Sequence, residues 1–288
     1  MKIIFFGTPE YVMPIVQALY KEYKNVHEKG VVAVVTQPPK PVGRKKILEY
    51  SPVDTWAYKH KIPIFNSQFS NKELPEADLG VVASYGKIIP KNIIEHFRYG
   101  VLNIHPSLLP KFRGASPIQE AIATGETITG VTIIKMDEQM DHGPAISAFK
   151  EAIRPDDTNE TLRARLFNRS AEFLIDLIPN YLNGKIKPKK QDHTKATFTK
   201  LIKKDDGFIK DPLGDPARAE RLFRAFEPWP GIWTEVKILR DEEIKLLRLK
   251  ILKLHLKNEK LIFDEVQLEG KNPVTWEEFK KGYPSFKL

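Results

Sequence analysis

Several features that are common in proteins are missing from this sequence of 288 residues, and cysteine is the first of them. The missing cysteines exclude disulfide bonds, a thiol nucleophile and any zinc or iron–sulfur site with cysteine ligands. No apolar run approaches the roughly 18 residues of a membrane-spanning helix. The first apolar run ends at Gly-Thr-Pro-Glu, without the small-residue cleavage site of a signal peptide. We therefore expect a cytoplasmic protein with no membrane partner.

Motifs for a nucleotide cofactor or a metal ion are also lacking. Gly7 stands alone after the first apolar run, whereas the dinucleotide-binding motif G-x-G-x-x-G needs three glycines. Among the histidines and acidic residues, His105, Asp141 and His142 form the one plausible metal-ligating cluster, and their spacing is not that of a helical zinc motif. We expect neither a bound nucleotide nor a metal.

Positive charge, by contrast, is in surplus, with a formal net charge of +9 at pH 7. Residues 185–204 hold eight lysines and a single aspartate, and the segment 40–46 contributes Lys40, Arg44, Lys45 and Lys46. Such a surplus favours an anionic partner such as nucleic acid. The cluster at 40–46, taken alone, fits solvated loop charge equally well.

The first part of the chain alternates apolar runs with helical patterns. The apolar runs predict strands at 2–7, 31–37, 79–86, 100–106 and 130–137, and the helical patterns predict helices at 10–24, 51–60, 90–98, 117–125 and 161–182. Strands that are apolar on both faces and alternate with helices form a parallel sheet covered on both sides. We therefore predict an α/β domain over residues 1–184 with a doubly wound, mostly parallel sheet.

The rest of the chain follows a different pattern. Residues 185–204 have no apolar periodicity, and we predict that they form a basic linker. Residues 205–288 combine helical patterns at 215–226 and 275–282 with several strand-like runs. These runs predict a small, shortened β-barrel-like domain, for which an oligonucleotide-binding (OB) type would fit.

Two polar side chains occur near the end of the strand predicted at 100–106, in the stretch NIHPSLLPKFRG. Asn103 and His105 are two residues apart, so in a strand they point to the same side. Ligands of open α/β sheets bind beyond the carboxyl ends of the strands, and Asp141 can reach that cleft if the strands at 100–106 and 130–137 are neighbours. An amide that donates to an oxyanion, an imidazole that moves a proton and a carboxylate that orients the imidazole suit a reaction at a carbonyl carbon.

The spacing leaves alternatives open. Asn103 and His105 could merely satisfy backbone groups of a strand-end turn, and His142 could be the working histidine. No Ser or Cys nucleophile is needed if the acceptor of the transferred group is itself an amine.

Several stretches resemble the folate-dependent formyltransferases and stand in that family's order along nearly the whole chain. They are FFGTPEYVMPIVQAL, VTQPPKPVGRKK, ASYGKIIP, NIHPSLLPKFRGASPI, GVTIIKMDEQMDHGPAI, RAFEPWPGIW and EVQLEGKNPVTWEEFKKG. The basic Thr-Gln-Pro loop and the Trp-Pro-Gly segment resemble the branch of the family that acts on tRNA. The resemblance implies a transfer of a formyl group from 10-formyltetrahydrofolate to the amino group of initiator methionyl-tRNA. We also expect a monomer.

The resemblance also implies roles for individual residues. Asn103, His105 and Asp141 match the family's catalytic triad. The residues matched to the folate site are Tyr85, Gly86, Ile88, Ile89, Pro90, Ser107, Leu108, Leu109, Pro110 and Asp137. The residues expected to meet tRNA are Lys40, Arg44, Lys45, Lys46, Lys187, Lys189 and Lys190, with a further contribution from residues 205–288.

The chain departs from the family pattern at two places. Lys40 stands where the family usually has arginine, which keeps the charge but loses the planar guanidinium fork. Residues 205–288 hold fewer strand-like runs than the family's barrel, which leaves their share of tRNA binding open. Rival functions are a formyltransferase for a small amine such as an amino-sugar nucleotide, a formyl-folate hydrolase and a non-catalytic RNA-binding protein.

Overall fold

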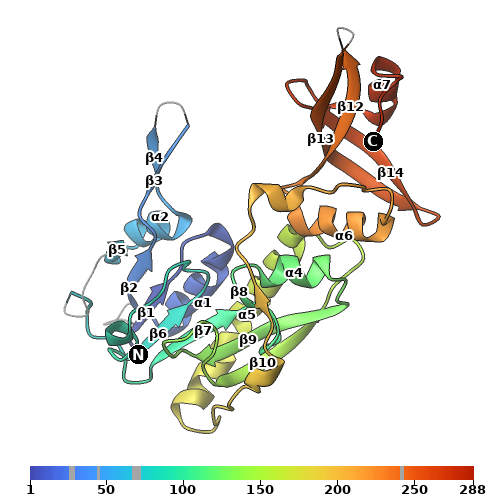
Figure 1. Ribbon diagram of the computed structural model, residues 1–288. Helices are drawn as coiled ribbons and strands as arrows, with labels where there is room; N and C mark the ends of the chain where they lie inside the picture. The colour runs from blue at the N-terminus through green and yellow to red at the C-terminus, as the bar shows by residue number, and fades with distance from the viewer. Residues whose placement is uncertain (26–29, 44–45, 67–72, 241–242) are drawn as a thin grey trace. The chain divides into compact units, whose positions relative to one another are not determined.

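The computed structural model describes residues 1–25, 30–43, 46–66, 73–240 and 243–288, which form two compact units (Figure 1). The first unit comprises Met1–Pro117, Ile128–Ala152 and Arg163–Thr199, and the second comprises Ile118–Thr127, Ile153–Leu162 and Lys200–Leu288. The domain boundaries at residues 184 and 204 stay a prediction. The stretch expected to be a linker is itself divided, because residues 185–199 belong to the first unit and 200–204 to the second.

A seven-stranded sheet forms the centre of the first unit, with the strand order β10-β9-β7-β6-β1-β2-β5. Its strands are β1 (Ile3–Phe6), β2 (Val31–Thr36), β5 (Ile64–Asn66), β6 (Leu79–Val82), β7 (Val101–His105), β9 (Ile128–Lys135) and β10 (Ala145–Ala152). From β1 the sheet grows through β2 and β5 on one side and through β6 and β7 on the other, always with parallel pairing. The predicted doubly wound, mostly parallel sheet is confirmed.

The end of the sheet beyond β7 differs from the sequence prediction. β9 pairs with β7 in antiparallel orientation, and β10, which was not predicted, pairs antiparallel with β9. A hairpin connection such as the loop of residues 136–144 can join antiparallel strands, whereas parallel strands need a long crossover. This loop carries Asp141.

Helices flank the sheet of the first unit. They are α1 (Met13–Tyr23), preceded by a 3₁₀ turn (Glu10–Val12), α2 (Pro52–Lys59), α3 (Lys91–Ile94) and α5 (Asn159–Leu182), whose first turn belongs to the second unit. β1 and β6 are buried along their whole length, as expected for strands covered on both faces. Ser51 and Asp54 form a reciprocal capping box at the start of α2, with Pro52 at its first position. The helix predicted at 90–98 is confined to α3.

Two short strand pairs complete the first unit. β3 (Lys40–Val42) and β4 (Ile47–Glu49) form an exposed antiparallel hairpin, and β8 (Arg113–Gly114) pairs in parallel with β11 (Phe198–Thr199). A 3₁₀ turn (His193–Lys195) precedes β11. Residues 189–199 thus run beside the segment that follows β7, and they are not a free linker.

The second unit contains a four-stranded antiparallel sheet, drawn in orange and red in Figure 1. Its elements are α4 (Pro117–Ala123, from Ile118), a 3₁₀ turn (Lys204–Gly207), α6 (Pro216–Phe226), β12 (Ile232–Arg240), β13 (Glu243–Lys257), β14 (Lys260–Leu268), β15 (Val274–Thr275) and α7 (Trp276–Gly282). Lys287 pairs with Lys237, so the end of the chain extends the sheet beyond β12. The sheet and its flanking helices make the small barrel-like domain that the sequence predicts.

Candidate active site

Two side chains of β7 converge on the loop between β9 and β10. Asn103 Nδ2 donates to Asp141 Oδ1 at 3.2 Å, and His105 Nδ1 lies 3.5 Å from the same oxygen. The strand period places both side chains on one side of β7, as the sequence predicts. Asp141 reaches them because the β9–β10 loop folds back toward β7. The carboxyl ends of two parallel strands, invoked in the sequence prediction, are not the reason.

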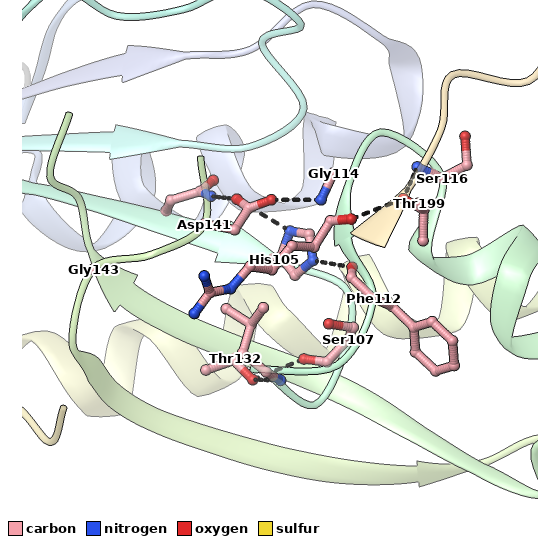
Figure 2. Close-up of polar contacts among 12 residues, drawn as sticks. His105, Ser107, Phe112, Gly114, Ser116, Thr132, Asp141, Gly143 and Thr199 are labelled. Atoms are coloured by element: carbon pink, nitrogen blue, oxygen red, sulfur yellow. Dashed lines mark hydrogen bonds and ion pairs between the residues drawn. The ribbon is translucent and has the colours of Figure 1, made fainter. Parts of the chain in front are cut away.

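The imidazole of His105 is held at both nitrogens (Figure 2). Nε2 lies 2.9 Å from the carbonyl oxygen of Phe112, and a carbonyl oxygen only accepts, so Nε2 carries a hydrogen and donates. Nδ1 faces the carboxylate of Asp141, and the residue is 4% exposed. The neutral ring therefore has its lone pair on Nδ1.

The carboxylate of Asp141 is fixed from two further directions. The backbone N–H of Gly114 donates to Oδ2 at 2.8 Å, as Figure 2 shows. Asp141 itself has a φ of +51°, a left-handed conformation that is uncommon for a residue with a side chain. A Cβ on Gly143 would lie 1.9 Å from the carbonyl oxygen of Lys135, so only glycine fits there.

The loop after β7 is braced by short hydrogen bonds (Figure 2). Ser107 Oγ donates to the carbonyl oxygen of Lys111 at 2.7 Å, and Thr132 Oγ1 donates to the carbonyl oxygen of Ser107 at 2.7 Å. The N–H of Leu109 donates to Thr132 Oγ1 at 3.0 Å. Leu108, Leu109 and Pro110, which were predicted to contact folate, are partly exposed, whereas Ser107 is buried.

The second predicted folate segment, residues 85–90, follows β6. Val82 of β6 is in register with Asn103 of β7, so this segment leaves the sheet beside the braced loop. Gly86, Ile88 and Pro90 are exposed, with Ile88 at 89%, and Tyr85 and Ile89 are buried. Burial raises the pKa of the Tyr85 hydroxyl.

Asp137 and His142 form a separate pair. His142 Nδ1 lies 2.7 Å from Asp137 Oδ2, and its ring stacks on His193 with centroids 4.0 Å apart. Arg113 Nη2 lies 2.8 Å from Nδ1 of His193. Burial, followed by the charges of His142 and Arg113, lowers the pKa of His193. Asp141 thus meets both His105 and Asn103, whereas the carboxylate that meets His142 is that of Asp137.

Two residues beside this site were missed in the sequence prediction. Arg113 lies in the quoted stretch NIHPSLLPKFRG but was not singled out, and it is 3% exposed. Gln191 sits in the lysine-rich stretch, where composition indicated a solvated linker, yet it is 9% exposed. A buried arginine needs a polar partner, but the sequence does not show that Arg113 is buried, so no local signal pointed to either residue.

The predicted tRNA-binding lysines are exposed in the described residues. Lys40 and Lys46 lie on and beside the β3–β4 hairpin, and Lys187, Lys189 and Lys190 precede Gln191. Arg44 and Lys45 lie outside the described residues. The structure therefore leaves the ammonium groups of the described five accessible to an anion.

Within the described ranges, no group of three or more His, Cys, Asp or Glu residues could hold a metal ion. None of the helices in the described part of the chain is long and apolar enough to cross a membrane.

The fold and the site correspond to a known class of one-carbon transferases. The profile of the formyl transferase family matches residues 1–178. The chain belongs to this family.

Curated relatives narrow the class. The methionyl-tRNA formyltransferase of Thermotoga maritima is 40% identical over 253 residues, which cover 85% of this chain and 78% of the relative. The methionyl-tRNA formyltransferase of Sulfurihydrogenibium sp. is 34% identical over 315 residues, which cover 98% of this chain and 97% of the relative. These relatives place the chain in the methionyl-tRNA formyltransferase branch of the family.

Solved structures share the fold. A methionyl-tRNA formyltransferase from Clostridium thermocellum superposes with a TM-score of 0.58 at 21% identity, over 93% of this chain and 98% of that one. A sugar 3N-formyl transferase, solved with dTDP and 5-N-formyl-THF, superposes with a TM-score of 0.67 at 19% identity. The superposition covers 96% of this chain and 97% of that one. The fold is thus common to enzymes with different acceptors, and the acceptor has to be argued from the chain itself and from its curated relatives.

Proposed function

We propose that this chain transfers a formyl group from 10-formyltetrahydrofolate to the amino group of initiator methionyl-tRNA. The observation that carries the proposal is the convergence of the Asn103 amide and the His105 imidazole on the Asp141 carboxylate. Membership of the methionyl-tRNA formyltransferase branch supplies the acceptor. We further propose that the chain acts as a monomer in the cytoplasm.

Asn103 is proposed to stabilise negative charge. Its Nδ2 has two N–H groups, one of which donates to Asp141. The other is available in the proposal to donate to the carbonyl oxygen under attack, where a preorganised donor lowers the barrier. Asp141 therefore acts twice, because it orients Asn103 as well as His105.

His105 is proposed to handle the proton that the amine loses. With the hydrogen on Nε2 held by the carbonyl oxygen of Phe112, the free lone pair is on Nδ1. A proton bound at Nδ1 faces the Asp141 carboxylate 3.5 Å away, which stabilises the imidazolium. Nδ1 is thus the atom at which we expect the proton to be held.

The residues proposed to hold the folate donor fit its position in the reaction. The segments 85–90 and 106–112 leave neighbouring parallel strands next to Asn103, and the first exposes the apolar side chain of Ile88. The amine attacks the formyl carbon of the donor, the bond between that carbon and N10 of the folate breaks, and tetrahydrofolate leaves with the proton that His105 took from the amine. The predicted set, including Asp137 and the backbone of residues 137–141, stays a proposal.

The lysines are proposed to contact the phosphates of the acceptor stem. Lys40 and Lys46 of the hairpin and the three lysines before Gln191 carry exposed charge. Arg44 and Lys45, which the proposal also includes, lie outside the described residues. Phosphate contacts of this kind supply affinity that falls steeply with salt and does not depend on sequence. This surface distinguishes the proposal from transfer to a small amine, which would not need it.

An assay with three acceptors tests the proposal. The purified chain is incubated with 10-formyltetrahydrofolate and, in parallel, charged initiator tRNA, charged elongator methionyl-tRNA or an amino-sugar nucleotide. Formyl-methionine on the initiator tRNA is the expected product. No formyl-methionine under saturating donor contradicts the proposal, formylation of the sugar supports the small-amine rival, and release of free formate in all three arms supports the hydrolase.

A further inference from the structure

Residues 189–199, which we call the strap, are bonded to both loops of the candidate active site. Lys189 exchanges two backbone hydrogen bonds of 2.8 Å with Ala145, at the end of the Asp141 loop. The N–H of Arg113 donates to the carbonyl oxygen of Thr197 at 2.8 Å, and β8 pairs with β11. In addition, the N–H of Ser116 donates to Thr199 Oγ1 (Figure 2). The strap therefore joins the loop after β7 to the loop after β9.

Gln191 is the residue of the strap that reaches the Asp141 loop with its side chain. Its Nε2 donates to the carbonyl oxygen of Asp141 at 2.8 Å and to that of Gly143 at 2.7 Å. These two bonds use both N–H groups of the amide. They hold the backbone on either side of His142. One of the two carbonyl groups is that of Asp141, the residue with a φ of +51°.

Arg113 determines which way the Gln191 amide points. Its Nη2 donates to Gln191 Oε1 at 2.8 Å, and an arginine can only donate. On the other side, the two carbonyl oxygens can only accept, so the amide has a single satisfactory orientation. Because Arg113 and Gln191 are both buried, a mismatch at either position leaves buried polar groups without partners, which is costly.

We propose that Gln191 is a positioning residue for the reaction: it holds the Asp141 loop so that the carboxylate meets Asn103 and His105. This inference rests on the proposed role of Asp141, and it makes the lysine-rich stretch part of the reaction centre as well as a surface for RNA. The Gln191 amide touches no reacting group. Its effect passes through the backbone of Asp141.

The variant Gln191→Glu tests the proposal most sharply. The carboxylate keeps an acceptor for Arg113, but it cannot donate and it repels the two carbonyl oxygens. We expect kcat for formyl transfer to fall by about tenfold to a hundredfold, as for a reacting group displaced by about 1 Å, while KM changes little. The matched control is Gln17→Glu, the same change at an exposed position of α1 in the same unit, with activity like that of the wild type.

A second readout needs no substrate. In protein labelled at the histidine nitrogens, Gln191→Glu should shift the ring-nitrogen resonances of His105, because Nδ1 faces Asp141, and Gln17→Glu should not. This measurement does not depend on activity. If the wild type fails to formylate methionyl-tRNA, the proposed function is contradicted, but the resonances still test whether Gln191 positions Asp141. Gln191→Asn, whose shorter amide can bond at most one of the two carbonyls, serves as the second variant and should give a smaller loss of kcat.

Three results would overturn the proposal. The first is a folded Gln191→Glu protein with unchanged kcat and unchanged His105 resonances. The second is a loss that appears in KM alone, since a positioning residue acts on the chemical step. The third is failure of both Gln191 variants to fold, because Gln191 would then be needed for stability and not for the placement of Asp141.

Discussion

The proposed reaction centre and the proposed RNA-binding surface of this protein are built in opposite ways. The Asp141 side chain is 12% exposed and meets Asn103, His105 and the N–H of Gly114. The β3–β4 hairpin, by contrast, leaves even its apolar side chains in solvent, with Val42 at 49% and Ile47 at 67% exposure. An isolated two-stranded hairpin is marginally stable in water.

The difference teaches where precision is needed. Chemistry at a carbonyl carbon requires donors that are in place before the reaction, and the centre is held by hydrogen bonds from several segments. Binding to a phosphate backbone requires charge within reach, and exposed lysines on a weakly supported hairpin provide it. Substitutions in the centre should therefore cause large losses in kcat that do not depend on salt, and substitutions on the surface should cause graded losses in affinity that do.

The largest effect is expected from His105→Ala. Removal of the imidazole should lower kcat by about 10²- to 10⁴-fold, the range for a general acid–base group, and leave the Kd for tRNA unchanged. Rapid-quench formylation assays and filter binding measure the two quantities. A loss of tRNA affinity in His105→Ala would contradict the claim that the reaction centre sets kcat while the basic surface sets the affinity for tRNA.

The next effect is expected from Asn103→Ala. Loss of the proposed oxyanion donor should lower kcat by about 10²- to 10³-fold, because one preorganised donor contributes that much in comparable sites. Asn103→Asp is the companion variant: it keeps the shape but places a carboxylate against Asp141, so its loss should be at least as large. If either variant retains wild-type kcat, Asn103 only donates a hydrogen bond to Asp141 and has no part in the reaction.

A smaller, salt-dependent effect is expected from the double variant Lys40→Ala/Lys46→Ala. The Kd for tRNA should rise, and the slope of log Kd against log salt should flatten by about one per lost phosphate contact. At saturating tRNA, kcat should stay unchanged. The matched control is Lys21→Ala/Lys59→Ala, which removes two exposed lysines from α1 and α2, and an equal loss in this control would show that the hairpin charges have no special role.

The smallest effect is expected from pH at the His142–His193 stack. The pKa of His193 is lowered in the folded protein, so the unfolded chain binds the proton more readily. Any stability that neutral His193 contributes is therefore lost as the pH falls from 6.5, the ordinary pKa of histidine, toward the lowered pKa of the folded state. NMR should show His193 titrating below 6.5, with the midpoint rising in His142→Ala. Since His193 lies at the surface, we expect this to be the smallest of the effects. A midpoint at or above 6.5 would contradict a lowered pKa of His193 in the folded protein.

Local patterns predicted those parts of the molecule that depend on neighbouring residues. The two-residue spacing of Asn103 and His105 and the apolar runs of β1, β2, β6 and β7 follow from strand geometry. The start of α2, with Ser51 as the N-cap and Pro52 at its first position, likewise follows from neighbouring residues. These features are visible in a few consecutive residues.

The parts that were missed depend on contacts distant in the sequence. The antiparallel direction of β9 and the existence of β10 depend on which edge of the sheet the chain joins, and the run at 130–137 is equally apolar in both directions. Gln191 lies 50 positions from Asp141, inside a stretch whose composition indicates solvent. Its burial follows from the polar needs of Arg113 and the Asp141 backbone, which only the folded chain brings together.

The most direct test of the account is the single-turnover rate of formylation by Asp141→Asn. The amide keeps the size of the side chain but removes the negative charge that faces His105 Nδ1. We predict a rate at least about a hundredfold below that of the wild type, with an unchanged Kd for initiator methionyl-tRNA and an intact fold. A rate close to that of the wild type would show that the Asn103–His105–Asp141 arrangement is not the reaction centre.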